Sequence, residues 1–314
     1  MIAVLCGGVG AARFLEGARL AFADEEIVAI VNVGDDDSIH GLHISPDIDT
    51  ILYTLSGLVN ASTGWGIADE SWKVMERLQV LGGETWFRLG DLDLATHLYR
   101  TGRLAAGATL SEVTAELAEK LGVGIEVVPA TDDKLRTLVH IQEVDSSQKT
   151  LRFQEYFVQR RTEPRVIGIR YALDTRCSIS AGALRALHQS RALIIAPSNP
   201  ILSIAPMFEI CGFGDLITSR RSDVYAISPI VAGKAIKGPA ARVMESLGLE
   251  PSALGIANFY KAFAENLIID NQDSELRSKI EDLELKVHSV DTMMTSLEKK
   301  MQLALHVREC INAG

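Results

Sequence analysis

The sequence has few cysteines and no closely spaced pair of them. Its four cysteines, Cys6, Cys177, Cys211 and Cys310, include no CxxC spacing. This scatter argues against a zinc site and against a disulfide framework. We interpret all four as small buried hydrophobic residues.

The sequence also lacks a long apolar run and an excess of basic residues. No run approaches the roughly 18 apolar residues of a membrane-spanning helix, and no basic region precedes the first apolar run. We therefore expect no membrane partner, no signal peptide and a cytoplasmic location. The formal net charge of −10 argues against nucleic acid as a partner, because such binding depends on Lys and Arg that neutralise phosphates.

Strand-like apolar runs alternate with helical patterns along most of the 314 residues. Several runs are continuous Val, Ile and Leu, which is typical of strands covered on both faces. This alternation predicts an α/β fold with a doubly wound, mostly parallel, Rossmann-like sheet. The expected strands lie at residues 2–6, 27–33, 124–129, 135–144, 150–158, 165–169, 192–197, 224–229 and 267–270.

Residues 50–122 interrupt the alternation with four amphipathic helical patterns. The last of them begins with Thr109 and Glu112, a spacing that favours a helix N-terminus. We therefore expect a helical insertion at residues 51–122 in an α/β domain made of residues 1–50 and 123–314. An amphipathic C-terminal pattern over residues 295–310 is expected to close the core.

Three glycines, Gly7, Gly8 and Gly10, connect the first expected strand to a helix in the stretch CGGVGAAR. Backbone N–H groups and a helix N-terminus at such a loop favour an anion. The dinucleotide fingerprint needs a further glycine where Arg13 stands, and the P-loop pattern is absent. The loop alone supports phosphate binding and a tight structural turn about equally.

Polar loops follow three more expected strands. Ligands of open α/β sheets gather outside the carboxyl ends of the strands, so we expect these loops to meet the glycine loop at one crevice. Carboxylates together with phosphate donors predict a nucleotide diphosphate and a divalent cation. The residues concerned are Asp35, Asp36, Asp37, His40, His43, Asp47 and Asp49, then Ser198 and Asn199, then Lys234 and Lys237.

Some of these residues have a second interpretation. Asp35 and Asp36 suit a metal site, but carboxylates directly after a strand are also ordinary turn residues. Asp47 and Asp49 suit the first turn of a helix as well as a ligand site. His40 and His43 have no cysteine or carboxylate partner at ligand spacing, so packing or hydrogen bonding is favoured over a transition metal.

Seven motifs, in order from residue 1 to about residue 310, together resemble the 2-phospho-L-lactate transferase family (CofD, or FbiA). They are GGVGAARFL, NVGDD with HGLHISPDIDT, GWGI, RLGDLDLATHLYRTG, FQEYFV, APSNPILSI and SPIVAGKAIKGPA. The resemblance implies transfer of a phospholactyl or phosphoenolpyruvyl group from a guanosine diphospho-donor to the ribityl hydroxyl of the deazaflavin FO. GMP leaves, and the product is the core of coenzyme F-420. The acyl group stays open between phosphoenolpyruvate, phospholactate and phosphoglycerate.

The resemblance also implies roles for particular residues. FO binding falls on Asp49 and Arg88, and Asp49 is the candidate for orienting or deprotonating the FO hydroxyl. The chemistry of a diphosphate predicts Mg²⁺, with Asp35 and Asp49 as its candidate ligands; for Asp49 metal ligation competes with the role toward the hydroxyl. The insertion would form one wall of the acceptor pocket. The nucleotide and its phosphates are assigned to Gly7, Gly8, Val9, Gly10, Ser198 and Asn199, whose loops match the family's nucleotide-phosphate region. From the residues alone, Lys234 and Lys237 either neutralise the diphosphate or merely complete a surface, and we add Lys234 to the phosphate-binding candidates.

Two aromatic residues and the function itself have alternative interpretations. Trp86 and Phe87 either help Arg88 to hold the flat deazaflavin or anchor the insertion to the sheet. A sibling family with this fold binds nucleotide-sugars and acts in regulation, but it gives no reason for Arg88 and Asp49. A nicotinamide-dependent oxidoreductase would need the missing glycine. We also expect a homodimer.

Overall fold

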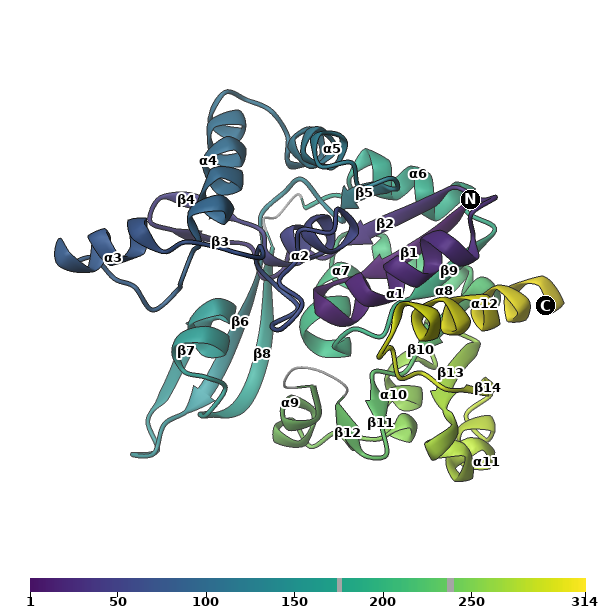
Figure 1. Ribbon diagram of the computed structural model, residues 1–314. Coiled ribbons are helices and arrows are strands. Elements are labelled where there is room, and N and C mark those ends of the chain that lie inside the picture. The colour runs from purple at the N-terminus through teal and green to yellow at the C-terminus, as the bar shows by residue number, and fades with distance from the viewer. Residues whose placement is uncertain (174–176, 236–239) are drawn as a thin grey trace.

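The computed structural model describes residues 1–173, 177–235 and 240–314. Seven strands form one sheet in the order β14-β13-β10-β9-β1-β2-β5, and every pairing in it is parallel (Figure 1). The expected doubly wound α/β fold is thus confirmed. The strands are β1 (Ile2–Cys6), β2 (Ile27–Val31), β5 (Glu126–Pro129), β9 (Ala192–Ile195), β10 (Val224–Ile227), β13 (Asn266–Asp270) and β14 (Lys286–Val290).

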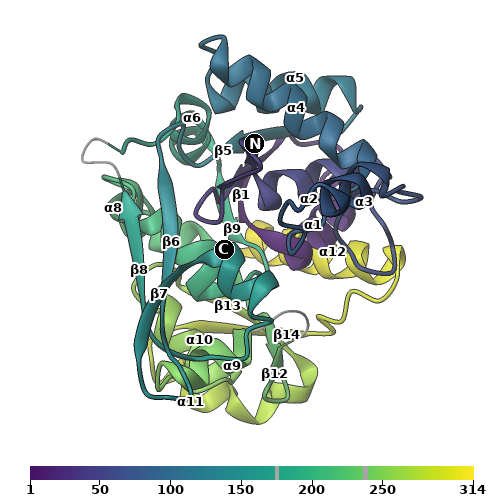
Figure 2. The ribbon, with the colours of Figure 1, turned by 90° about the vertical axis from the view of Figure 1, so that its left-hand side faces the viewer.

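Helices cover both faces of this sheet, which explains its continuous apolar strands. Figure 2 shows α1, α2 and α12 on one side of the sheet and α6 and α8 on the other. The strand order reverses at β1, because the chain adds β2 and β5 on one side and the other four strands on the opposite side. Such a reversal is where open α/β sheets bind ligands. The helices are α1 (Gly8–Ala21), α2 (Pro46–Leu55), α6 (Ala181–Gln189), α8 (Phe213–Ser219) and α12 (Leu297–Ala313).

The expected insertion contains helices α3 (Lys73–Val80), α4 (Asp91–Ala105) and α5 (Leu110–Lys120). Helix α5 begins with the capping box that Thr109 and Glu112 predicted. The helix expected to open the insertion starts earlier, at Pro46, and its Ile48, Ile51 and Leu52 belong to the main core. A separate small core joins the insertion to the hairpin of β3 (Asp37–Ile39) and β4 (Leu42–Ile44).

A second sheet is antiparallel, with β6 (Leu135–Gln142) between β7 (Gln148–Arg152) and β8 (Arg165–Leu173). The strand expected at residues 150–158 is wrong beyond Arg152, because Glu155–Gln159 forms a π-helical turn. The Glu155 carboxylate accepts hydrogen bonds from the backbone N–H of Arg152 at 2.9 Å and from its guanidinium at 2.7 Å. This closed turn directs Tyr156 into the core of the second sheet.

The remaining elements are short. Cys211 is exposed on the segment between α7 (Ala205–Phe208) and α8, so the expectation that all four cysteines are buried is wrong there. Within the described residues no single helix is long and apolar enough to cross a membrane; Pro200–Phe208 and Phe213–Ser219 reach that length only together, at 96° to each other. The short elements are η2 (Pro200–Ile204), α7 (Ala205–Phe208), η3 (Arg221–Asp223), β11 (Ile230–Val231), β12 (Lys234–Ala235), α9 (Ala240–Ser246), α10 (Ala253–Tyr260), η4 (Asn271–Leu276) and α11 (Arg277–Glu281).

Candidate active site

The loops after β1 and β9 lie against each other, as the strand-end argument predicted. The Ser198 hydroxyl donates a hydrogen bond to the Gly7 carbonyl oxygen at 2.9 Å, and the Gly7 N–H approaches the same hydroxyl at 3.3 Å. Gly10 allows this contact, because a Cβ on it would stand 2.3 Å from the Pro197 carbonyl oxygen. The glycine loop and Ser198 therefore form one continuous floor at the carboxyl edge of the sheet.

Asn199 fixes the next part of this floor. Its side-chain oxygen accepts hydrogen bonds from the N–H groups of Ile201 and Leu202, at 3.0 and 3.1 Å, and so caps the helical turn η2. Its buried side-chain nitrogen has no partner within the described part of the chain. That nitrogen is a donor available to an oxygen of a ligand.

Asp47, in the first turn of α2, lies at the start of α1. Its Oδ2 accepts a hydrogen bond from Asn32 Nδ2 at 3.0 Å, and the backbone N–H of Gly8 also hydrogen-bonds to its carboxylate. A helix N-terminus favours a negative group, so this carboxylate stands where a phosphate would be favoured. Burial raises the pKa of Asp47 to about 7.

The acidic loop after β2 contains three adjacent buried or nearly buried carboxylates. Asp36 Oδ2 accepts from His43 Nε2 at 2.9 Å and from Ser45 Oγ at 2.8 Å, and burial raises the pKa of Asp36. Burial and then the charge of Asp47 raise the pKa of Asp35 well above its ordinary value. Asp35 Oδ1, Asp36 Oδ1 and Asp37 Oδ2 are buried oxygens that have no partner among the described residues.

These oxygens test whether the site suits a divalent cation. Unpartnered carboxylate oxygens are the ligands that Mg²⁺ prefers, and Mg²⁺ in nucleotide sites needs only one or two carboxylates plus phosphate oxygens and water. Nowhere in residues 1–173, 177–235 and 240–314 do three His, Cys, Asp or Glu residues converge as a ready ligand set. The acidic loop therefore fits a cation that shares its ligands with a diphosphate.

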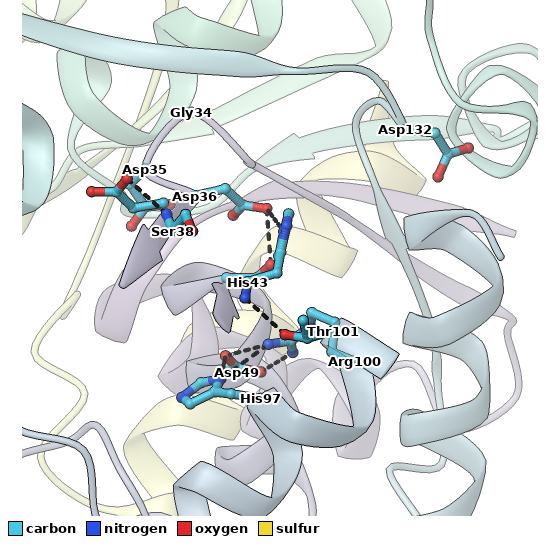
Figure 3. A network of polar contacts seen from close by, with 12 residues as sticks. Gly34, Asp35, Asp36, Ser38, His43, Asp49, His97, Arg100, Thr101 and Asp132 are labelled. Carbon is cyan, nitrogen blue, oxygen red and sulfur yellow. Dashed lines mark hydrogen bonds and ion pairs between the residues drawn. The ribbon is translucent and has the colours of Figure 1, made fainter. Parts of the chain in front are cut away.

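Asp49, in α2, is buried like Asp35 and Asp47 and contacts α4. Its Oδ2 accepts from Arg100 Nη1 at 3.1 Å, and its Oδ1 pairs closely with Arg100 Nη2 (Figure 3). His97 Nδ1 is 3.7 Å from Asp49 Oδ2, and its Nε2 is 3.2 Å from Asp93 Oδ1. Asp49 thus joins α2, on which it lies, to α4.

His97 and Arg100 were not predicted as site residues from the sequence. Their spacing could have indicated the pair, because residues three positions apart lie on one face of a helix. In the motif RLGDLDLATHLYRTG only Arg88 received a role, and both missed residues lie later in it. Both side chains are almost fully buried, at 1% and 0% exposure.

Arg88 is exposed and stacks on an aromatic ring, but not on either neighbour in the sequence. Its guanidinium carbon lies 4.2 Å from the centre of the Trp72 ring. Trp86 and Phe87 pack instead against the small core of the insertion, which supports their interpretation as anchors. Trp72 was not singled out in the sequence.

Two lysines were expected near the phosphates. Lys234 is exposed on the β11–β12 hairpin, and Lys237 lies outside the described residues. The hairpin is held by Asp273, whose two carboxylate oxygens accept from the Ala232 N–H at 3.1 and 3.2 Å. The position of Lys234 is therefore fixed by the backbone beside it, while its side chain extends into solvent.

Solved structures share the fold of this chain. Two crystal structures of one Bacillus halodurans protein, a member of the UPF0052 family, match with TM-scores of 0.59 and 0.58 at 16% identity. The first match covers 92% of both chains, and the second covers 99% of this chain and 98% of the other. At this identity the likeness concerns the fold alone.

Curated relatives are similar over almost the whole chain. A phosphoenolpyruvate transferase of Streptomyces coelicolor is 35% identical, with 96% of this chain and 95% of that protein covered. A 2-phospho-L-lactate transferase of Methanocaldococcus jannaschii is also 35% identical, with 98% and 97% covered. The model of the family described as 2-phospho-L-lactate transferase CofD matches residues 2–309. The chain therefore belongs to the CofD family and is a 2-phospho-L-lactate transferase-like enzyme.

Proposed function

We propose that this enzyme transfers a phospholactyl- or phosphoenolpyruvyl-type group from a guanosine diphospho-donor to the ribityl hydroxyl of FO, releasing GMP, in the biosynthesis of coenzyme F-420. The observation that carries the proposal is the meeting of the glycine loop, Ser198 and the carboxylates at the carboxyl edge of the sheet. The two transferase types named among its relatives are equally similar, so the proposal leaves the acyl group open.

The donor diphosphate would lie over the glycine loop. The N–H groups at the start of α1 and the free side-chain nitrogen of Asn199 are the donors it would meet. Gly7, Gly8, Val9, Gly10 and Ser198 shape this floor, and Lys234 on the β11–β12 hairpin is proposed to add positive charge. Because Asp47 stands at the same helix start, the diphosphate needs a cation to offset the repulsion between them.

Mg²⁺ fits this requirement, with Asp35 and Asp49 as the proposed protein ligands and water and the diphosphate completing its shell. When bound, the ion neutralises charge on the oxygens of the diphosphate. Phosphoryl transfer has a loose transition state, so the contribution of the chain itself is mostly positioning. The buried, unpartnered Oδ1 of Asp35 supports the Asp35 part of this assignment.

FO would approach from the side of the insertion. The Arg88 guanidinium, stacked on Trp72, offers its second face and its N–H groups to the deazaflavin. Asp49 is proposed to orient the ribityl hydroxyl and to accept its proton. The hydroxyl oxygen then forms a bond to the phosphorus distal to guanosine, the bond from that phosphorus to the bridging oxygen breaks, and GMP leaves with the bonding electron pair.

The test is a transfer assay that uses purified protein, FO and Mg²⁺. Guanosine diphospho-donors of phosphoenolpyruvate, phospholactate and phosphoglycerate are supplied in turn, and the FO adduct and GMP are quantified by liquid chromatography and mass spectrometry. We expect one donor to be preferred, and we expect Asp49→Asn to lose most of the turnover. Asp24→Asn serves as the matched control, because Asp24 is exposed and precedes β2, at the amino ends of the strands. Absence of product with all three donors would overturn the proposal.

We also propose that the enzyme is a homodimer in the cytoplasm, without nucleic acid or membrane as a partner. Leu297 and Leu305 on α12 are 50% and 37% exposed and offer apolar surface for a second copy. Light scattering during gel filtration should give about twice the chain mass of 34.1 kDa. A mass equal to one chain at micromolar concentration would contradict the dimer.

A further inference from the structure

Helix α4 of the insertion holds two parts of the candidate site at once. Arg100 pairs with Asp49, and the next residue, Thr101, accepts a hydrogen bond from the His43 N–H at 2.8 Å (Figure 3). His43 in turn contacts Asp36 Oδ2 at 2.9 Å. One turn of one helix thus supports both the acidic loop and the carboxylate of α2.

The contact between Arg100 and Asp49 is a buried ion pair, and each partner depends on the other. Arg100 has no exposed surface, and Asp49 is 5% exposed. A buried ion pair costs both partners their hydration, so each depends on the other for compensation. The planar guanidinium fork contacts both carboxylate oxygens, which a lysine ammonium does not reproduce.

This fork restricts how Asp49 can act. A carboxylate has about four acceptor positions on its two oxygens. Arg100 takes one on each oxygen and thereby fixes the plane of the carboxylate. The other positions keep a defined direction for a hydroxyl group or a cation. His97, which lies 3.3 Å from Arg100 through its Nδ1, packs beside the guanidinium.

We propose that Arg100 is a positioning residue for the transfer: it acts through Asp49, and it makes the geometry of the site depend on the placement of the insertion. The inference rests on the proposed function, in which Asp49 orients the acceptor hydroxyl and contacts Mg²⁺. Partners of this kind behind a ligating or reacting group typically contribute about 10- to 100-fold in activity or metal affinity.

A purely structural role for Arg100 makes a different prediction. The pair would then help only to hold α4 against α2, and each folded molecule of a variant would keep the wild-type turnover and Mg²⁺ dependence. A positioning role instead lowers kcat and shifts Mg²⁺ dependence in protein that is fully folded. The two roles separate when activity is measured well below the melting temperature of each variant.

Arg103 offers a matched control on the same helix. It lies one turn further along α4 and makes a bidentate salt bridge with Glu116, from Nε to Oε2 at 3.0 Å and from Nη2 to Oε1 at 2.6 Å. That pair is partly exposed, and it joins α4 to α5 rather than to Asp49 or the acidic loop after β2. Substitution of Arg103 therefore removes a similar interaction without touching Asp49.

The experiment compares Arg100→Lys and Arg100→Gln with Arg103→Lys and Arg103→Gln, using the preferred donor, FO and a series of Mg²⁺ concentrations. Folding is checked by circular dichroism and thermal melting. We expect Arg100→Lys to lower kcat by about 10- to 100-fold and to raise the Mg²⁺ concentration for half-maximal rate. Arg100→Gln should lose more, and both Arg103 variants should stay within about twofold of the wild type because that pair is partly exposed.

Arg100→Lys keeps the charge, so it decides the question even if Arg100→Gln does not fold. A folded Arg100→Lys protein with wild-type kcat and wild-type Mg²⁺ dependence would overturn the inference while leaving the proposed function intact. Equal losses in the Arg100 and Arg103 variants would also overturn it, because the effect would then belong to α4 in general. A wild-type protein that is inactive with every donor would overturn the proposed function, and the inference with it.

Discussion

Asp47 lies directly against Gly7: a Cβ built on Gly7 would stand 2.4 Å from Asp47 Oδ2 and 2.8 Å from the Ser203 Cβ. The glycine loop is therefore closely packed as well as suited to an anion. We expect Gly7→Ala to lower the free energy of unfolding by about 1–3 kcal/mol, the usual cost of overpacking. It should also weaken GDP binding, because relief of the clash displaces Asp47 or the loop. Urea unfolding and calorimetric titration with GDP measure the two effects.

Gly102→Ala is the control for that prediction. Gly102 lies in the exposed part of α4, and a Cβ there would meet no atom within 4 Å. Alanine favours a helix over glycine by about 0.5–1 kcal/mol, so this variant should be more stable and bind GDP normally. A Gly7→Ala protein that matches the wild type in both measurements would show that the loop adapts without cost.

Asp47 should make the stability of the metal-free protein depend on pH. Its pKa is about 7 in the folded chain, whereas a carboxyl group in the unfolded chain titrates near 4. The folded state therefore holds this proton more tightly, and its contribution is fully present below pH 4 and is lost as the pH rises to 7 and above. Relative to Asp47→Asn, the wild type should lose about 2 kcal/mol between pH 5 and pH 8.

The measurement is urea unfolding of both proteins, without divalent cations, at several pH values in that range. The comparison with Asp47→Asn removes this proton together with the effect of the Asp47 charge on the pKa of Asp35, while the other carboxyl groups titrate in both proteins. A difference in unfolding free energy that stays constant from pH 5 to pH 8 would show that Asp47 ionises normally in the folded protein.

The strands of the main sheet were predictable where their burial is continuous. β1, β2 and β9 are uninterrupted apolar runs, because helices cover both faces of the sheet, and such runs need no knowledge of the partners. The hairpin β3–β4 was not predicted: its strands have three residues each and include Asp37 and His43. It exists because Ile39 and Ile44 pack on the insertion, which is a tertiary contact.

At residues 151–158 the error is the reverse, because a strand was predicted where part of the segment forms a helical turn. Leu151, Phe153 and Phe157 stand at alternating positions of this stretch, and this period of two correctly indicates a strand up to Arg152. Beyond Arg152 the local hydrogen bonds of Glu155 outweigh the alternation and bend the chain into a π-helical turn. Local hydrogen bonds of this kind compete with strand formation and leave little trace in hydrophobic periodicity.

The candidate site was predictable to the extent that it depends on topology. Parallel strands carry their following loops to one edge, which is why Gly7 and Ser198 could be placed together from the sequence. The pair of Asp49 and Arg100 could not be placed, because its two residues are 51 positions apart and lie on different helices. No periodicity within either helix indicates which face of the other it will meet.

Trp72 should contribute to the binding of FO through Arg88. The Arg88 guanidinium stacks on the Trp72 ring at 4.2 Å, and a partly exposed cation–π contact is worth about 0.5–1 kcal/mol. If Arg88 contacts FO, we expect Trp72→Leu to weaken FO binding about two- to fivefold, the equivalent of that energy. Arg88→Ala should weaken it more, and neither change should alter GDP binding.

Trp65, which is 53% exposed, provides the matched control for these titrations as Trp65→Leu. It should bind FO like the wild type, since no cation stacks on that ring among the residues that the structure describes. Equal loss of FO and GDP affinity in Arg88→Ala would contradict the division of the site into a nucleotide side and an acceptor side.

Asp35 should affect stability and metal-dependent binding in opposite directions. Its carboxylate is buried near Asp36 and Asp47, and the burial and the neighbouring charges raise its pKa well above the ordinary value. Asp35→Asn removes one of these charges, so the metal-free variant should be more stable than the wild type at pH 8. The same change removes a proposed Mg²⁺ ligand, so Mg²⁺ should no longer strengthen GDP binding.

This opposition distinguishes a cation site from a structural turn. If Asp35 served the turn alone, its replacement would lower stability or leave it unchanged, and the effect of Mg²⁺ on GDP affinity would persist. Thermal melting at pH 8 and GDP titrations with Mg²⁺ or with EDTA give both quantities, with Asp24→Asn as the exposed control. A variant that is both less stable and still responsive to Mg²⁺ would therefore place the ion elsewhere, because a cation site that crowds like charges loses stability when the cation is absent.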